Sequence, residues 1–238
     1  QAYHFKVLFH VLRILGYAWA GDLRHLAYGM VNLPEGKMKS REGTVVDADD
    51  LLDELSVLAG EEIEAKGREE LVGDVTAIAE SIALGALNYF LLQSDPLRDM
   101  TFNPRESLSF TGNTGPYLQY TGARISSMIK KFESRKEEFS AGVFRADLLT
   151  VPEEWEIIKL LSLYPEITEA AAEQLNPSLV AGCLYDMARL FSRYYHDNPV
   201  LHNDDPDLVV TRITLSRAVG IMLKQGFKLL GIPFLEVM

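Results

Sequence analysis

A short polar loop brings three cationic side chains together between two glycines. Gly36 and Gly43 enclose Lys37, Lys39 and Arg41. Glycine allows the backbone to bend and to approach a ligand closely, and ammonium and guanidinium groups stabilise negative charge that develops on a phosphate chain. The loop is therefore a candidate site for phosphate chemistry. A solvated surface loop has the same composition, so the residue types alone leave that second interpretation open.

A second set of residues with chemical potential lies further along the chain. Tyr117 and Tyr120 are three residues apart, so they share one face if this segment is a helix. Arg124 follows one turn later, and Tyr195 belongs to another aromatic group. Tyrosine rings can stack on unpaired bases, and arginine can bind phosphate. A nucleic-acid surface and a packed core both fit this pattern.

Three stretches of sequence, in this order, resemble a single family. The first stretch, residues 28–52, combines a glycine-methionine-valine segment, the lysine-rich loop and an acidic helix start. The second, residues 112–125, reads GNTGPYLQYTGARI. The third consists of residues 184–196 together with the end of the chain, residues 229–238. Over nearly its whole length the chain resembles arginyl-tRNA synthetases, which are class I aminoacyl-tRNA synthetases. The lysine-rich loop is similar to the KMSKS-type loop of that class.

The resemblance implies a mostly α fold in consecutive parts. The tail of a Rossmann-type α/β catalytic domain, with the KMSKS-type loop, is expected in residues 1–60, a helical connection in residues 61–110, and a helical-bundle anticodon-binding domain in residues 111–238. The resemblance also implies the reaction of the complete enzyme, which attaches arginine to arginine tRNA. ATP and Mg2+ are then substrates of the complete enzyme, and no tightly bound cofactor is expected in this chain.

The resemblance implies catalytic roles residue by residue. Lys37 matches the first lysine of the loop, which stabilises the pyrophosphate that leaves ATP. Because the loop reads Lys-Met-Lys-Ser-Arg rather than KMSKS, either Lys39 or Arg41 takes the place of the second lysine. A plain core position is an equal alternative for Val31. The expected ATP contacts are Met30, Val31, Lys37 and Met38, and the expected arginine contact is Gln1.

For the helical part, the resemblance implies contacts with the anticodon loop. The expected tRNA-binding residues are Asn113, Tyr117, Tyr120, Arg124, Tyr195 and Met238. Core packing is the alternative role for the two tyrosines on the first helix, and a dispensable tail is the alternative for Met238. The sequence has no spacing typical of metal ligands, so we expect no metal site.

The sequence contains no His-x-Gly-His string, a motif that the family carries upstream of the matched segments. We therefore expect the chain to be the C-terminal part of a longer protein and to be inactive as a ligase by itself. Two alternatives stay open, namely a free-standing helical tRNA-binding module without catalysis and a helical scaffold that binds nothing. A tRNA-binding measurement separates these two.

Composition narrows the class of protein. A net charge of -11 argues against an indiscriminate nucleic-acid binder, so a tRNA would have to meet the basic side chains of residues 124–136 and 212–228. The single cysteine, Cys183, excludes an internal disulfide, favours a cytoplasmic location and is expected to be a buried structural thiol. No uninterrupted apolar run reaches about 18 residues, so we expect no membrane span. We also expect a monomer.

Periodicity indicates the elements that must position these residues. Apolar spacing predicts a helix over residues 3–15, a buried strand over residues 24–33, and, after the loop, a helix capped by Asp47 or Asp49. From residue 61 onward the helical period dominates. Further helices are expected over residues 72–92, from Pro116 onward, and over residues 155–163, 179–195 and 208–230.

Overall fold

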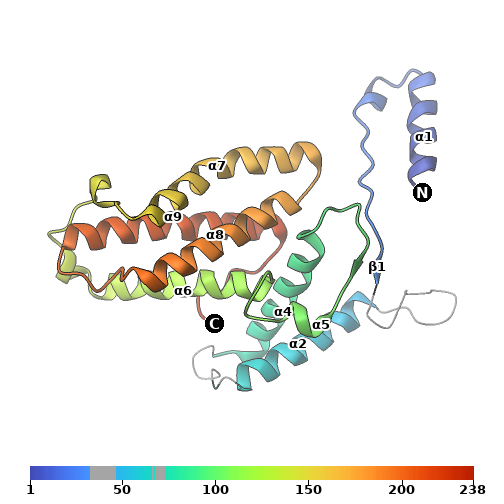
Figure 1. Cartoon of the computed structure of the whole chain (residues 1–238). Helices are drawn as coiled ribbons and strands as arrows, with labels where there is room; N and C mark the ends of the chain where they lie inside the picture. Colours follow the sequence, from blue (N-terminus) through green and yellow to red (C-terminus); the bar gives the residue numbers. More distant parts are fainter. Residues whose placement is uncertain (33–46, 66, 68–72) are drawn as a thin grey trace.

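The computed structural model describes residues 1–32, 47–65, 67 and 73–238, and helices dominate these residues (Figure 1). In chain order the elements are α1 (Ala2–Ile14), η1 (Ala18–Gly21), β1 (Val31–Asn32), α2 (Ala48–Ala65), α4 (Val75–Leu92), β2 (Met100–Thr101), α5 (Pro104–Ser107), α6 (Gly115–Ser134), η2 (Lys136–Phe139), η3 (Ala146–Leu148), α7 (Pro152–Gln174), α8 (Ser178–Asp197) and α9 (Pro206–Leu230). The mostly α fold predicted from the sequence is confirmed.

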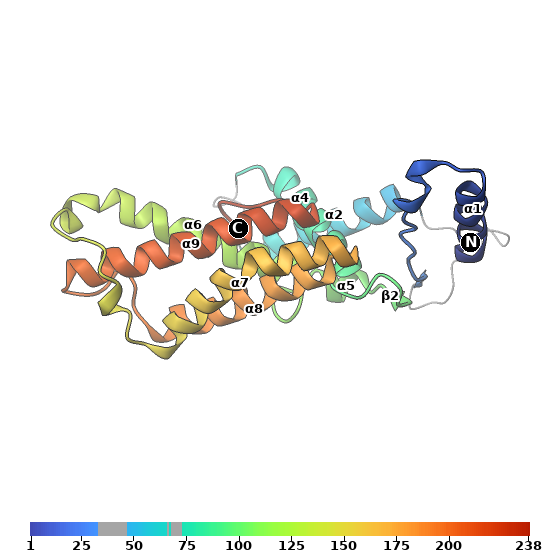
Figure 2. The same ribbon diagram turned by 90° about the horizontal axis from the view of Figure 1, so that it is seen from above.

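Four long helices form an elongated bundle. In Figures 1 and 2, α6, α7, α8 and α9 lie alongside one another, with α7 packed on α8 and α9 packed on both α6 and α8. On α8, Val180, Leu184, Met187 and Phe191 recur every three or four residues and are buried, which is the period of one helix face. Burial of such apolar faces, more than helix propensity, stabilises helices of this kind.

A second core joins the bundle to the first half of the chain. α2 packs on α4, and α4 packs on α6. Leu55 of α2, Ile82 of α4 and Phe102 are completely buried in this second core. Because α4 also contributes Tyr89 to the core of the bundle, it belongs to both. The α2–α4 pair therefore connects the segment around β1 with the bundle.

Helix α4 is an exception to the expectation that no segment is suited to cross a membrane. Its 18 residues have a mean hydropathy of 1.6, so its length and composition would permit a span. In the structure, Ile82, Ala83 and Ala86 are buried in the core shared with α2 and α6. Only 33% of this helix is buried, so packing accounts for its apolar residues on the faces that contact α2 and α6.

The buried strand predicted over residues 24–33 is much shorter in the structure. β1 comprises only Val31–Asn32, which pairs in parallel with β2. Upstream, Leu26 and Tyr28 are 59% and 84% exposed, so the expectation of a buried strand is wrong there. A strand needs a hydrogen-bonded neighbour. Within the described residues, only the two residues of β2 supply one, and apolar spacing cannot reveal that.

Local signals at helix ends agree with the structure. At the start of α2, the side chain of Asp47 accepts a hydrogen bond from the backbone N–H of Asp49 at 3.1 Å. Asp74 caps α4 in the same way, through Ala77. Just past α1, Gly16 has a φ of 80°, a left-handed conformation that favours glycine. These caps depend on neighbouring residues alone, which is why the sequence predicts them well.

Helix α7 is longer than the pattern over residues 155–163 predicts. It runs from Pro152 to Gln174 and contains Pro165 in its interior. Proline removes a backbone hydrogen bond and usually ends a helix. Here Ile157 and Tyr164 are buried in the core of the bundle. Packing along the length of α7 therefore offsets the cost of the proline, an effect that local sequence does not show.

A buried ion pair fastens α7, α8 and α9 together. Nε of Arg212 donates to Oε1 of Glu154 at 2.9 Å, and the hydroxyl of Tyr194 donates to the same oxygen at 3.1 Å. The side chains of Arg212 and Glu154 are 10% and 0% exposed. The expectation that Arg212 belongs to a basic surface is therefore wrong. Its charge is needed inside the bundle because a buried carboxylate without a partner is very costly.

Candidate nucleic-acid interface

Helix α6, which carries half of the expected tRNA-binding residues, begins at a fixed point against α4. Thr114 caps the helix by accepting a hydrogen bond from the backbone N–H of Tyr117 at 3.3 Å. Pro116 stands in the first turn, as expected. A Cβ atom added at Gly115 would lie 2.1 Å from the carbonyl oxygen of Gly85 in α4. This close approach sets the position of α6 and of the residues that follow.

Three residues predicted from the sequence meet where α6 faces α8. The guanidinium carbon of Arg124 lies 4.7 Å from the ring centre of Tyr120 and 5.7 Å from that of Tyr195. Nη2 of Arg124 also donates to the hydroxyl of Tyr120 at 3.0 Å. These contacts form what we call the Tyr–Arg–Tyr cluster, composed of Tyr120, Arg124 and Tyr195. All three side chains are half-buried, so each keeps a part that solvent reaches.

The cation of this cluster differs from other cations of the bundle in its partners. Within the described part of the chain, Arg124 has aromatic partners and no carboxylate partner. Its positive charge is therefore available to an anion such as an RNA phosphate. By contrast, several exposed cations pair with acidic side chains: Arg189 with Asp186, Arg193 with Glu153 and Glu156, and Lys130 and Lys224 with Glu236.

The last residues of the chain fold back onto α4 and α6. Gly231, with a φ of 66°, ends α9, and Nδ2 of Asn88 donates to its carbonyl oxygen at 2.7 Å. Nε2 of Gln119 donates to the carbonyl oxygen of Pro233 at 2.9 Å. Met238 is only 7% exposed and lies in the second core, against which Tyr120 also packs. Met238 is therefore part of a packed core beside the Tyr–Arg–Tyr cluster.

Tyr117 and Asn113 lie nearer the start of α6. The hydroxyl of Tyr117 lies 3.3 Å from Oγ of Ser192, and its ring is tilted against that of Tyr185, so this half-buried side chain joins α6 to α8. Oδ1 of Asn113 accepts a hydrogen bond from the Tyr89 hydroxyl at 2.5 Å. Burial raises the pKa of Tyr89, which keeps this hydroxyl protonated as a donor. Both residues thus have partners within the protein.

The residues expected on the catalytic side are largely outside the described residues. The undescribed range 33–46 includes Lys37, Met38, Lys39 and Arg41. Met30 is 56% exposed, and its backbone N–H donates to Oδ1 of Asp99 at 2.7 Å. Val31 is half-buried against the second core, and Gln1 is exposed at the N-terminal end of α1. Among the described residues, no three His, Cys, Asp or Glu side chains gather at one place.

Gly29 and Gln119 hold this region together, although the sequence pattern does not single them out. A Cβ atom at Gly29 would lie 2.2 Å from the carbonyl oxygen of Arg98, so only glycine lets the segments before β1 and β2 pass this closely. Gln119 is completely buried and donates to Ser81 in α4 at 3.0 Å, in addition to its bond to the chain's end. The available signals were a glycine in a strand-like segment and a glutamine among apolar residues.

Comparison with known families divides the chain into two matched parts. Residues 1–104 match the model described as tRNA synthetases class I (R), catalytic domain, and residues 118–238 match the model described as DALR anticodon binding domain. The second match contains the Tyr–Arg–Tyr cluster and Met238, whereas Asn113 and Tyr117 fall between the two matches.

Individual relatives agree with the family matches. The arginine–tRNA ligases of Treponema denticola and Borrelia hermsii are 57% and 45% identical to all of this chain, which covers 41% and 40% of their lengths. The structure of Thermus thermophilus arginyl-tRNA synthetase aligns with a TM-score of 0.83 and 32% identity over 97% of this chain and 38% of that chain. The chain thus spans about two fifths of the length of these relatives. It belongs to the arginyl-tRNA synthetase family, with a class I catalytic part followed by a DALR anticodon-binding domain.

Proposed function

We propose that the complete protein is a cytoplasmic, monomeric arginine–tRNA ligase that uses ATP and Mg2+ to attach arginine to arginine tRNA. The order of the two family matches and the identity with arginine–tRNA ligases along the whole chain support this proposal. Residues 1–60 then belong to the catalytic domain, residues 61–110 connect, and residues 111–238 bind the anticodon loop. Mg2+ commonly binds through substrate phosphates and waters, so it would arrive with ATP.

The catalytic contribution of this chain is the KMSKS-type loop. Lys37 stabilises the pyrophosphate that leaves ATP, and either Lys39 or Arg41 supplies a second positive charge. Met30, Val31 and Met38 lie beside the nucleotide, and Gln1 lies at the edge of the arginine pocket in this proposal. A flexible ammonium group suits a phosphate that moves during the reaction.

The anticodon-binding role rests on the Tyr–Arg–Tyr cluster. Two half-buried rings contact a guanidinium that has no carboxylate partner among the described residues, so the cluster combines surfaces for base stacking with a charge for phosphate. Met238 packs in the second core together with Tyr120, and Asn113 and Tyr117 would contact the anticodon loop from the start of α6. An acidic protein can bind RNA at such a site because the local charge, rather than the net charge, meets the phosphates.

Binding of arginine tRNA to the complete protein tests this role. We expect Tyr195→Ala to weaken binding by about 5- to 150-fold, since a stacked ring contributes about 1–3 kcal/mol. Arg124→Ala should instead lower the slope of log affinity against log salt concentration by about 1, because one phosphate contact is lost. Fluorescence anisotropy at several salt concentrations measures both effects.

Matched variants separate these effects from general damage. Phe144 is a 53% exposed ring outside the cluster, and Arg145 is an exposed arginine that pairs with Asp147. Phe144→Ala and Arg145→Ala should leave tRNA affinity close to that of the parent. All variants are first checked for helical content and thermal stability. If folded Tyr195→Ala and Arg124→Ala proteins bind arginine tRNA like the parent, the cluster is not the anticodon site.

A further inference from the structure

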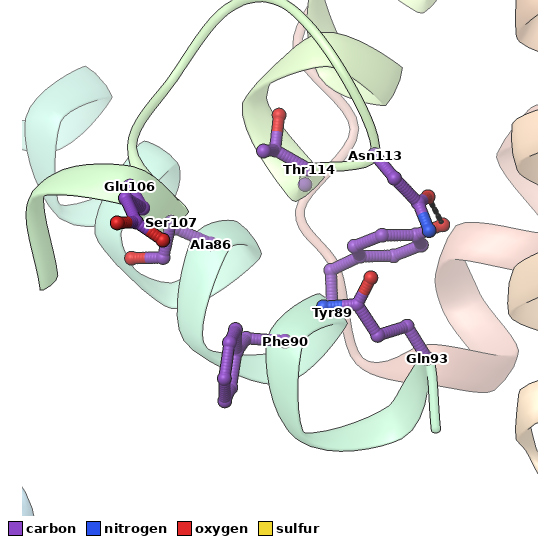
Figure 3. Close-up of a pocket in the computed structure, with 9 residues that line it drawn as sticks. Ala86, Tyr89, Phe90, Gln93, Glu106, Ser107, Asn113 and Thr114 are labelled. Carbon is purple, nitrogen blue, oxygen red and sulfur yellow. Dashed lines mark hydrogen bonds between the residues drawn. The ribbon is translucent and has the colours of Figure 1, made fainter. Parts of the chain in front are cut away.

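A small pocket opens where α4, α5 and the first turn of α6 meet. It encloses about 210 Å3. Figure 3 shows that its lining side chains come from α4, α5 and the loop before α6, and α6 itself contributes only Gly115. The volume suits one flat ring system rather than a larger ligand, since sites for drug-sized molecules have volumes of about 300–1,000 Å3. The Tyr–Arg–Tyr cluster does not line this pocket.

Apolar groups form the walls of the pocket. Ala86 and Phe90 of α4 line the pocket, together with the backbone of Gly115. The ring of Phe90 is held edge-on against Phe102 at 4.8 Å, so it keeps a defined orientation. Gly115 lies close to Gly85, so the start of α6 packs directly on the backbone of α4 and closes this side of the pocket. These walls can take the faces of an aromatic heterocycle.

Hydrogen-bonding groups at the rim are already oriented. Oδ1 of Asn113 is occupied by the buried hydroxyl of Tyr89, which turns the amide N–H donors of Asn113 toward other partners. No described residue accepts from those donors. One carboxylate oxygen of Glu106 accepts from Nδ2 of Asn103 at 2.8 Å, which fixes the carboxylate and leaves its other oxygen available. Gln93 adds an amide to the same rim.

We infer that this pocket binds a guanine base. Guanine presents N–H donors at N1 and N2 along one edge and acceptors at O6 and N7 along the next. The carboxylate of Glu106 can accept from the donors in a charge-assisted hydrogen bond, while the amide of Asn113 donates to the acceptors. Adenine presents an acceptor at N1, which the carboxylate repels. The base can come from an unstacked nucleotide of RNA or from a free guanine nucleotide.

If the base belongs to a bound tRNA, this inference deepens the proposed function and rests on it. Proteins that read an extruded base combine a fitted pocket with hydrogen bonds to its edge. The pocket and the Tyr–Arg–Tyr cluster would then hold different nucleotides, because they lie at the start and in the middle of α6. Base preference at the pocket can therefore be tested independently of overall RNA affinity.

The test uses the complete protein and labelled single-stranded RNA hexamers of adenosine with one central guanosine, inosine or adenosine. Inosine lacks only the N2 amino group, so it isolates one hydrogen bond to Glu106. We expect the guanosine hexamer to bind about tenfold more tightly than the inosine hexamer, the size of one charge-assisted bond. Parallel titrations of GMP into the parent and the Glu106→Gln variant show whether a free nucleotide is sufficient or whether the base must belong to RNA.

Two nearly isosteric variants remove the recognition groups and keep their internal partners. Glu106→Gln retains an oxygen for Asn103, and Asn113→Asp retains an oxygen for the Tyr89 hydroxyl. We expect Glu106→Gln to abolish the preference for guanosine over inosine and Asn113→Asp to weaken guanosine binding about tenfold. Glu169→Gln, at an exposed carboxylate of α7, is the matched control and should change nothing.

The result that would overturn the guanine site differs from the result that would overturn tRNA binding at the Tyr–Arg–Tyr cluster. Equal affinities for all three hexamers, with GMP binding unchanged in Glu106→Gln, would exclude a guanine site, as would a preference that survives in both variants. In either case Arg124→Ala still reports on the Tyr–Arg–Tyr cluster, because it should lower the affinity for all three hexamers alike. GMP binding that weakens in Glu106→Gln, without a preference among the hexamers, assigns the pocket to a free nucleotide.

Discussion

Arginine side chains occur in three different environments in this protein. Arg124 is half-buried among rings and has no carboxylate partner in the described residues, whereas Arg212 is buried and bonded to Glu154. Arg193 represents a third case, an exposed arginine 3.4 Å from Glu156. These environments differ in how far the charge is removed from water. A charge buried away from water must be paired, whereas an exposed ion pair contributes little to the stability of the fold. Only the first case leaves a charge available for a ligand.

The buried pair should therefore dominate the stability of the bundle. We expect Arg212→Met to lower the free energy of unfolding by about 3–5 kcal/mol, because Glu154 would remain buried without its cation. Arg193→Met, at an exposed pair, should change it by less than about 1 kcal/mol. Urea denaturation followed by circular dichroism measures both. Equal effects of the two substitutions would show that the Glu154 site is not desolvated as the structure indicates.

At the scale of elements, the crossing of α4 and α6 is the contact on which the positions of both candidate sites depend. Gly115 places the start of α6 against Gly85, and Gln119 bonds to Ser81 one turn further on. A Cβ at Gly85 would in turn lie 2.6 Å from the side chain of Gln119. The two helices therefore approach closely because two glycines and one glutamine fit together, and no single helix pattern encodes that fit.

A methyl group at this crossing should be costly. We expect Gly115→Ala to destabilise the protein by about 1–3 kcal/mol, since overpacking forces the helices apart, and to weaken binding at both candidate sites. Gly182→Ala is the matched control, because nothing lies within 4 Å of a Cβ at that position of α8. There alanine should stabilise the helix by about 0.5–1 kcal/mol. Thermal unfolding of the two variants, which should move in opposite directions, provides the check.

For the whole molecule, the notable feature is how the two family parts are joined. β1, which precedes the KMSKS-type loop, pairs with β2, and α2, which follows the loop, packs on α4 (Figure 1). α4 in turn contacts α6 and bonds through Asn88 to the segment after α9. The segment that follows the loop is therefore connected, through α2 and α4, to the anticodon-binding domain.

The catalytic role of the KMSKS-type loop can be tested by substitutions in the complete enzyme. If Lys37 stabilises the leaving pyrophosphate, Lys37→Ala should slow aminoacylation by about tenfold to a thousandfold, the range for removal of one preorganised group from a transition state. Lys39→Ala and Arg41→Ala, measured in the same assay, identify the second cation. Unchanged turnover in Lys37→Ala, with reduced turnover in one of the others, would move the main role to that residue. Binding of arginine tRNA should be unaffected in all three.

The sequence alone was informative wherever the cause is local or the motif is contiguous. The cap at Asp47, the turn at Gly16 and the periodic faces of α8 and α9 depend on residues a few positions apart. The family resemblance was likewise carried by contiguous strings of residues. It named Tyr120, Arg124 and Tyr195 among six expected tRNA-binding residues, and the structure brings these three together across α6 and α8.

Tertiary structure decided whatever depends on partners far away in the chain. Arg212 is buried because Glu154, 58 positions away, needs its charge, and the strand over residues 24–33 is reduced to Val31–Asn32 because β2 offers only two residues. The pocket beside Asn113 exists because α4, α5 and α6 meet there. Sequence patterns report what each segment prefers by itself, whereas burial, ion pairing and cavities are properties of segments brought together, so only the folded chain determines them.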